Sequence, residues 1–422
     1  MTAILLGSFV VLLIINVPVS FALMIASLAA LTWGGIPPTL VGQRMTAAMD
    51  SFILLAIPFF LLAGQLMSRS GIARDIMNLA YALLGWMRGG LAHASIGAGT
   101  IMGGMTGSAV AEASSIGGVM IPEMQAKGYG GAYSAAVVAA GSLISVLIPP
   151  SVPLIIYGVV TGTSVGRLFI AGLIPGLLMA AVMILVTWWM AMRAGYPRGP
   201  RPTPGAVWRA FVASLWGLFM PVVIIGSIRF GIATPTEASV LAVAYALLVG
   251  MVVYRSIRWR DLPRIMLDTA VTNGVVLLLI SAATLYGLII TREQVPQEAA
   301  RLILELTGNP TVLLLLILAV YLVAGMILDL GAAIIILVPV FWPMTRQVGI
   351  DPVHFGIVTV MGLAVGLITP PVGASLFVTC GIARVNLIAA ARAVLPYVAA
   401  LTLLVVAVIL WPDIALWLTR DM

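Results

Sequence analysis

The chain has 422 residues, of which 62% are hydrophobic and 8% charged, and its formal net charge is +7 at pH 7. Soluble domains carry about 25% charged residues, so this composition excludes one and predicts an all-α polytopic protein surrounded by the lipid bilayer. The single cysteine, Cys380, excludes a disulfide framework and a cysteine-based metal site. The basic residues lie between apolar spans without an aromatic-interleaved patch, which excludes nucleic acid as a partner.

Apolar runs of membrane-spanning length recur along the chain. The first is too long for the core of a signal peptide and lacks a cleavage pattern, so we predict a membrane helix there. The predicted spanning helices, in chain order, are 3–32, 51–68, 168–192, 212–228, 235–254, 268–290 and 388–411.

Four further apolar runs are interrupted halfway. Runs 90–122 and 312–343 contain Gly, Ser or Asp at their centres, which predicts two re-entrant hairpins that enter and leave on one side of the membrane. Runs 131–161 and 353–383 each contain a double proline, which removes two backbone donors and stops a helix. We predict two broken helices there, because freed backbone groups survive in a membrane only inside protein or beside a wet cavity.

The basic residues predict an orientation. If the two arginine-rich loops at 193–209 and 255–264 face the cytoplasm, 14 of the 21 Lys and Arg residues lie inside. The N-terminus is then cytoplasmic and the C-terminus periplasmic. The remaining seven lie outside, at Arg44, Arg167, Arg229, Arg292, Arg301, Arg346 and Arg420.

The interruptions recur at a fixed spacing. Pro149-Pro150 match Pro370-Pro371 at 221 residues, and Pro175 and Gly141 find partners at the same spacing, in Pro396 and Gly362. Pro122 matches Pro339 at 217, which sets Glu112 opposite Asp329 and requires a four-residue insertion or deletion. Gly and Pro are frequent in membrane helices, so a single match arises by chance, but the series with opposed topology predicts an inverted repeat.

Two interrupted helices at corresponding places in two halves of one chain are typical of a secondary transporter, so we divide the chain into transport repeats that contain the interruptions and scaffold helices outside them. We predict first scaffold helices at 1–68 and a first transport repeat at 69–192. A basic loop, a linker helix and second scaffold helices follow at 193–290, and a second transport repeat at 291–422.

The first hairpin tip and the first break offer oxygen ligands. Glycines permit unwinding, and hydroxyls with freed carbonyls suit a small alkali cation rather than a transition metal. The alternative is that Gly and Ser only allow close helix packing. The candidate residues for substrate and cation here are Gly104, Thr106, Gly107, Ser108, Ser145, Pro149, Pro150 and Ser151.

The second hairpin and break repeat this pattern around one acidic residue. Asp329 lies deep in an apolar run, where a charge costs at least about 2.5–3.5 kcal/mol, so it is expected to face a cavity, an ion or a partner. An Asp beside Gly also caps a half-helix, and the two roles are compatible. Glu112 either stabilises its half-helix or ligates an ion. The candidates here are Gly325, Asp329, Gly331, Gly366, Thr369, Pro370 and Gly373.

A series of motifs in order resembles the large membrane subunit of the TRAP (tripartite ATP-independent periplasmic) transporters, the DctM-like family, over nearly the whole chain. The first hairpin tip has fewer serines than relatives often carry, which leaves its number of hydroxyl ligands open. The motifs are Gly107-Ser108-Ala109-Val110-Ala111-Glu112-Ala113, Ile121-Pro122-Glu123-Met124, Ile148-Pro149-Pro150-Ser151, Gly231-Ile232-Ala233-Thr234-Pro235-Thr236-Glu237-Ala238, Asp351-Pro352-Val353-His354-Phe355-Gly356 and Gly366-Leu367-Ile368-Thr369-Pro370-Pro371-Val372-Gly373.

The resemblance implies an elevator-type ion-transporter fold in the bacterial inner membrane. It implies that sodium ions drive uptake of an organic acid delivered by a periplasmic substrate-binding protein. It further implies a small four-helix membrane subunit on a separate polypeptide. No cofactor other than the coupling sodium ions is expected, and no Gly-x-x-x-x-Gly-Lys loop for a nucleotide occurs.

We therefore predict a sodium-coupled importer of an organic acid that works by alternating access. An autonomous sodium–carboxylate symporter of the same fold, needing no binding protein, is the alternative. An intramembrane enzyme is disfavoured because Glu112 and Asp329 lie beside glycine-rich bends rather than opposite a nucleophile. A passive channel is disfavoured because paired broken helices in opposed repeats are typical of alternating access.

Overall fold

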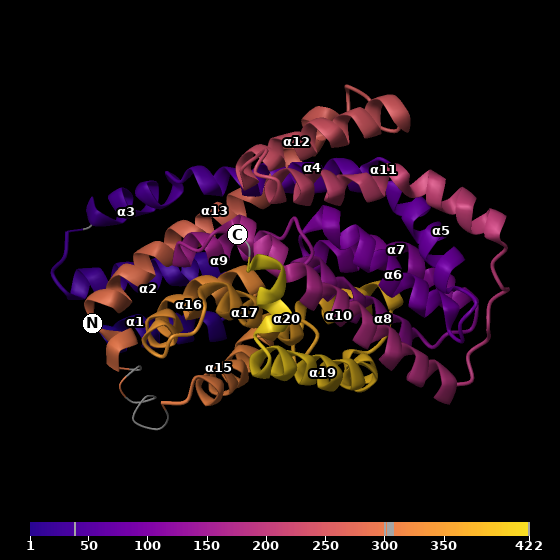
Figure 1. Cartoon of the computed structure of the whole chain (residues 1–422). Coiled ribbons are helices and arrows are strands. Elements are labelled where there is room, and N and C mark those ends of the chain that lie inside the picture. Colours follow the sequence, from indigo (N-terminus) through magenta and orange to yellow (C-terminus); the bar gives the residue numbers. More distant parts are fainter. Residues whose placement is uncertain (38, 299–300, 302–307, 421–422) are drawn as a thin grey trace.

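The computed structural model describes residues 1–37, 39–298, 301 and 308–420 (Figure 1). Within this described part the regular elements are helices, apart from an isolated bridge between Arg88 and Arg198. Seven of these helices are long and apolar enough to cross a membrane, which agrees with the all-α membrane protein predicted from composition. Residues 299–300 and 302–307, in the predicted second transport repeat, lie outside the described part.

Six of the seven predicted spans are confirmed as helices. Helices α3 (Thr39–Met49), α5 (Ile72–Leu84) and α20 (Asp413–Leu416) were not predicted, because each is shorter than a membrane crossing. The confirmed spans are η1 with α4 (Phe52–Leu55 and Ala56–Arg69), α10 (Val165–Arg193), α11 (Pro204–Arg229), α12 (Pro235–Leu248, continued by a π turn over Val249–Val253), α13 (Leu262–Arg292) and α19 (Leu387–Leu410).

The predicted single helix over 3–32 is wrong. The structure has two helices there, α1 (Thr2–Ile14) and α2 (Val19–Trp33), which pack side by side (Figure 1). Asn16 adopts a positive φ of 64°, and the N–H of Val17 donates to the carbonyl of Leu12, which is the hydrogen-bond pattern of a Schellman cap. Pro18 then opens the second helix.

This hairpin also changes the position of the N-terminus. A Cβ on Gly34 would collide with the side chain of Met1, and the backbone N–H of Thr2 donates to Glu293 at 3.2 Å. Residue 1 therefore lies at the same end of the molecule as Gly34, whereas a single crossing would have put it at the opposite end. The prediction of a cytoplasmic N-terminus depended on that crossing and loses its basis.

Cysteine labelling tests the N-terminal hairpin. In a Cys380→Ser background, we expect an impermeant maleimide to modify Thr2→Cys and Gly35→Cys from the same side of sealed vesicles, and Ala194→Cys from the other side. Modification of Thr2→Cys and Gly35→Cys from opposite sides would contradict the hairpin and support a single helix that crosses the membrane.

Both pairs of helices predicted as hairpins, and both broken helices, are present as chain segments. In Figure 1 the two hairpins enter the molecule from opposite ends, with α6 and α7 at the right and α15 and α16 at the left. Both double prolines contain a cis peptide bond. The elements are α6 (Gly90–Thr106), α7 (Ala109–Ala126), α8 (Gly131–Ser142) with η2 (Leu143–Val146), α9 (Val152–Thr161), α15 (Pro310–Gly325), α16 (Leu330–Gln347), α17 (Pro352–Gly366) and α18 (Ala374–Ala383).

One spacing relates the two halves without an insertion. Moving α7 forward by 221 residues brings its ends from 109 and 126 to 330 and 347, which are the ends of α16. Pro122 therefore corresponds to Pro343 and not to Pro339, and Asp329 corresponds to Ser108 and not to Glu112. The predicted pairings at a spacing of 217 are therefore wrong. Helix α16 contains two prolines, and the sequence alone did not show which of them corresponds to Pro122.

Helices outside the hairpins pack around the point where the hairpin tips meet. Helix α4 packs against α12, α13 and α6, and α13 also packs against α2 and α16. The start of α12 has a capping box: the hydroxyl of Thr234 accepts the N–H of Glu237, and the carboxylate of Glu237 accepts the N–H of Thr234 at 2.7 Å. These packed helices surround the site described next.

Candidate functional site

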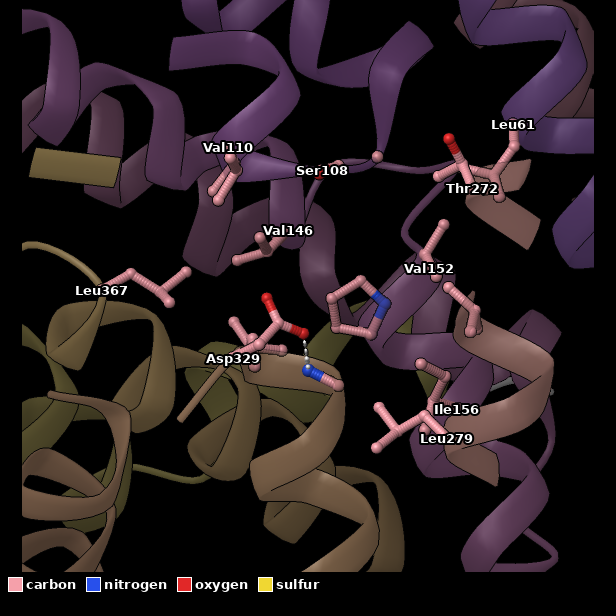
Figure 2. A pocket seen from close by; sticks show the side chains of 16 residues that line it. Leu61, Ser108, Val110, Val146, Val152, Ile156, Thr272, Leu279, Asp329 and Leu367 are labelled. Atoms are coloured by element: carbon pink, nitrogen blue, oxygen red, sulfur yellow. Dashed lines mark hydrogen bonds between the residues drawn. The ribbon is translucent and has the colours of Figure 1, made fainter. Parts of the chain in front are cut away.

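The two hairpin tips and the two breaks line one cavity of about 180 Å³ (Figure 2). Hairpin one, break one and hairpin two supply most of the wall, and α4 and α13 close it from the side. The lining residues are Leu61, Gly107, Ser108, Ala109, Val110, Val146, Val152, Pro153, Ile156, Thr272, Val276, Leu279, Asp329, Leu330, Gly331 and Leu367.

Of the described residues that line this cavity, Asp329 is the one with a charged side chain. One carboxylate oxygen accepts the N–H of Gly331 at 3.0 Å, so Asp329 caps α16. Figure 2 shows the carboxylate directed into the cavity, toward the side formed by Val146 and Ser108. The capping role predicted for Asp329 is confirmed, and the residue as a whole is exposed.

Hairpin one contributes the uncapped start of a helix. No side chain accepts a hydrogen bond at the N-terminus of α7, although Ser108 occupies the capping position. The N–H groups of the first turn have no partners within their own helix, and Ala109 and Val110 line the cavity. The N-terminus of α9, in contrast, is capped by the hydroxyl of Ser151, which accepts the N–H of Leu154 at 3.3 Å. This start of α7 therefore offers donors and a positive dipole end to an anion.

Glycines bring each hairpin tip against the break of its own half. A Cβ on Gly103 would lie 2.9 Å from the Cα of Ser145, and the carbonyl of Gly107 accepts the N–H of Val152 at 3.4 Å. In the second half, a Cβ on Gly325 would lie 2.6 Å from the carbonyl oxygen of Leu363. These approaches explain why tip and break glycines recur in both halves.

The structure brings four of the fifteen predicted site residues to the cavity wall, namely Gly107, Ser108, Asp329 and Gly331. Several others have internal roles. Gly104 faces Pro221, since a Cβ there would lie 2.7 Å from its Cγ, and Gly366 packs on Gly325. The hydroxyls of Ser145, Ser151 and Thr369 donate to the backbone carbonyls of Ser142, Val146 and Val365 at 2.7, 2.5 and 2.7 Å. Pro149, Pro150 and Pro370 form the breaks themselves, and Gly373 donates its N–H to the carbonyl of Met326 at 3.3 Å.

Glu112 lies away from the cavity, between α6 and α8. Its side chain is fully buried and accepts the hydroxyl of Thr106 at 3.0 Å. A Cβ on Gly99 would lie 3.0 Å from the other carboxylate oxygen and 3.0 Å from the carbonyl of Gly141. Of the two roles left open for Glu112, this position favours support of hairpin one, because the carboxylate ties Thr106 to the second arm.

Sequence reasoning missed the residues that come from α4 and α13. Thr272, Val276 and Leu279 lie on one face of α13 at spacings of four and three, which is the helical pattern for a shared surface. The sequence signal that could have identified this surface is Thr272, a polar residue in helical register with Val276 and Leu279. Ser375 is buried just after the second break, and its hydroxyl has no partner among the described residues.

The oxygen atoms near the second break are of the type that an alkali cation prefers as ligands. The position that a Cβ on Gly373 would take lies 3.1 Å from the carbonyl oxygens of both Leu367 and Thr369, so two oxygens converge where the side chain is absent. The described residues contain no cluster of His, Cys, Asp and Glu that would hold a transition metal. The second break therefore places two backbone carbonyl oxygens close together, which is the type of ligand that an alkali cation prefers.

Comparisons with known proteins give a consistent result. Residues 6–414 match the family described as "Tripartite ATP-independent periplasmic transporter, DctM component". The chain is 37% identical over 401 residues to the 2,3-diketo-L-gulonate TRAP transporter large permease protein YiaN of Escherichia coli, covering 95% of this chain and 94% of that one. It is 38% identical to the sialic acid TRAP transporter large permease protein SiaM of Vibrio cholerae, covering 96% of each chain.

A more distant relative and a solved structure extend this comparison. The C4-dicarboxylate TRAP transporter large permease protein DctM of Rhodobacter capsulatus is 32% identical, covering 97% of each chain. The Alcanivorax borkumensis YdaH transporter has a similar fold, with a TM-score of 0.62 and 17% identity over 89% of this chain and 88% of that one.

Proposed function

This chain belongs to the family of the DctM component of tripartite ATP-independent periplasmic transporters, and on that premise we propose that it imports an organic acid by coupling to sodium ions. It is a transporter permease of the membrane. The observation that carries the proposal is the meeting of both hairpin tips and both breaks at one cavity, where the uncapped start of α7 faces Asp329.

In the proposed mechanism the substrate carboxylate lies at the start of α7. The N–H groups of Ala109 and Val110 and the hydroxyl of Ser108 donate to it there, and the α7 dipole favours its negative charge. Sodium ions bind at the two clusters of the hairpin tips and breaks, and they offset the charge of Asp329 beside an anionic substrate. Because each ion favours the arrangement that the substrate needs, binding of ion and substrate is coupled.

Alternating access then follows from movement of the hairpin domain. We propose that the two repeats at 69–192 and 291–422 move as an elevator past a scaffold of 1–68 and 193–290. A periplasmic binding protein delivers the acid, and a small four-helix membrane subunit completes the scaffold. Relatives whose names include sialic acid, C4-dicarboxylate and 2,3-diketo-L-gulonate support a carboxylate as the substrate class.

Reconstitution tests this proposal against the autonomous symporter. Proteoliposomes would contain this chain and its small subunit, with an inward sodium gradient and the binding protein loaded with candidate acids. We expect uptake that requires sodium and falls at least about tenfold without the binding protein. Uptake that is unchanged without the binding protein would favour the autonomous symporter, and uptake that persists in potassium would contradict sodium coupling.

A further inference from the structure

The size of the cavity between the hairpin tips limits the substrate that it can hold. Its volume is about 180 Å³. A buried cavity of about 150 Å³ accommodates benzene, which has six carbon atoms, whereas pockets for drug-sized molecules span about 300–1,000 Å³. By proportion, this cavity holds a ligand of about seven or eight non-hydrogen atoms. A carboxylate accounts for three of these atoms, so the rest of the ligand is short.

Helices α7, α9 and α16 all begin at this cavity, and the start of α9 is already occupied by the protein itself. The N–H of Val152 donates to the carbonyl of Gly107 at 3.4 Å. The next residue, Pro153, has no N–H, and the N–H of Leu154 donates to the hydroxyl of Ser151 at 3.3 Å. The first turn of α9 therefore has no donor left for a substrate anion.

The start of α16 holds a carboxylate of the protein. Asp329 caps this helix, and one of its oxygens accepts the N–H of Gly331 at 3.0 Å. In the register of 221 residues that relates the two halves, Ser108 has the same position at the start of α7, where no side chain caps the helix. The cavity therefore has one helix start for a substrate carboxylate, and Asp329 takes the equivalent place in the other half.

The rest of the described wall offers little to a second anionic group, since none of its side chains is cationic. The hydroxyl of Thr272 donates its proton to the carbonyl of Asp268 in its own helix at 3.0 Å, so it can only accept a hydrogen bond from a ligand. Most of the remaining wall is aliphatic, with Leu61 of α4, Ile156 of α9 and Leu279 of α13 (Figure 2). A sodium ion that offsets the charge of Asp329 supplies no hydrogen-bond donor.

We propose that the substrate is a small monocarboxylate with a short, mostly apolar body, and that a dicarboxylate of the same size is rejected. The carboxylate lies at the start of α7, and the apolar body lies against the aliphatic side chains of α4, α9 and α13. A second carboxylate would lose its hydration beside Asp329 without gaining a donor, whereas an apolar group of the same size loses nothing there. This inference rests on the proposed function, because it assigns a substrate class to the same site.

Two acids of equal size test the substrate class by calorimetric titration of the full chain. 4-Methylpentanoate and succinate each have eight non-hydrogen atoms, and the first carries an isopropyl group where the second carries its other carboxylate. In sodium, we expect the Kd of 4-methylpentanoate to be at least about tenfold lower than that of succinate. Equal or tighter binding of succinate would overturn the monocarboxylate and leave the proposed function standing. Equal binding of 4-methylpentanoate in sodium and potassium would contradict sodium coupling and leave the substrate class standing. Binding of neither acid would overturn the substrate class together with the cavity as the substrate site.

Exchange of the capping residues tests the two helix starts separately. Asp329→Ser gives α16 the residue that precedes α7, and serine caps a helix about as well as aspartate, so we expect a folded protein that has lost the preference for 4-methylpentanoate. Ser108→Asp places a carboxylate at the start of α7 and is expected to abolish binding of both acids. The matched control is Asp351→Ser, which changes the cap of α17 outside the cavity and should retain the preference. An unchanged preference in Asp329→Ser, or binding that survives Ser108→Asp, would overturn the proposal.

Discussion

Sodium-driven uptake is expected to fall about 100-fold when Asp329 is replaced by asparagine, while the protein stays folded. Asparagine caps a helix as well as aspartate does, so the hydrogen bond from the N–H of Gly331 is retained. What is lost is the negative charge toward the cavity. A charge-assisted contact is worth up to about 3 kcal/mol, and each 1.4 kcal/mol is a factor of ten. The measurement is initial uptake against sodium concentration in proteoliposomes.

Asp351 provides the matched control. It also caps a helix, since its carboxylate accepts the N–H of Val353 at 2.7 Å at the start of α17, but it does not line the cavity. Asp351→Asn is expected to transport as the wild type. Asp329→Ala removes cap and charge together, so it should lose uptake and also about 1 kcal/mol of stability. Full sodium-dependent uptake by Asp329→Asn would show that Asp329 acts as a helix cap and that its charge is not needed for transport.

The second large effect is expected at the contact between hairpin two and its break. A Cβ on Gly366 would lie 2.5 Å from both the Cα and the carbonyl carbon of Gly325, and backbone atoms cannot move aside as a side chain can. We expect Gly366→Ala to destabilise the protein by about 2 kcal/mol, typical of overpacking. At about 2–4 °C per kcal/mol, the thermal midpoint falls by about 4–8 °C. Uptake should be lost as well, because the tip of hairpin two is displaced from the cavity.

Gly118 separates this collision from a general effect of alanine. It lies inside α7 with no atom within 4 Å of the position of an added Cβ. Alanine gains up to about 1 kcal/mol of helix propensity over glycine in a helix interior, so a loss of stability in Gly366→Ala beside a gain in Gly118→Ala indicates the collision. Gly118→Ala is expected to match or exceed the wild type in thermal midpoint and to retain uptake. Equal midpoints for the two variants, by intrinsic fluorescence, would show that the contact at Gly366 is not close-packed.

Composition and local chain chemistry were sufficient for the class of protein and the positions of its interruptions. A chain with 8% charged residues does not have the composition of a soluble domain, and a double proline stops a helix in any context. The hairpins were predictable in the same way, because Gly107 and the Gly-flanked Asp329 interrupt apolar runs that are too long for one crossing. These are local effects, and they act through a few neighbouring residues.

The tertiary structure decided what depends on contacts between distant segments. The chain reverses at Asn16 within an apolar run, which composition does not reveal, and the repeat pairs Pro122 with Pro343 rather than Pro339. It also decided that Asp329 faces the cavity while Glu112 lies between α6 and α8. The physical reason is that a sequence pattern fixes where a helix can break, whereas packing against other helices fixes which side of the break is open.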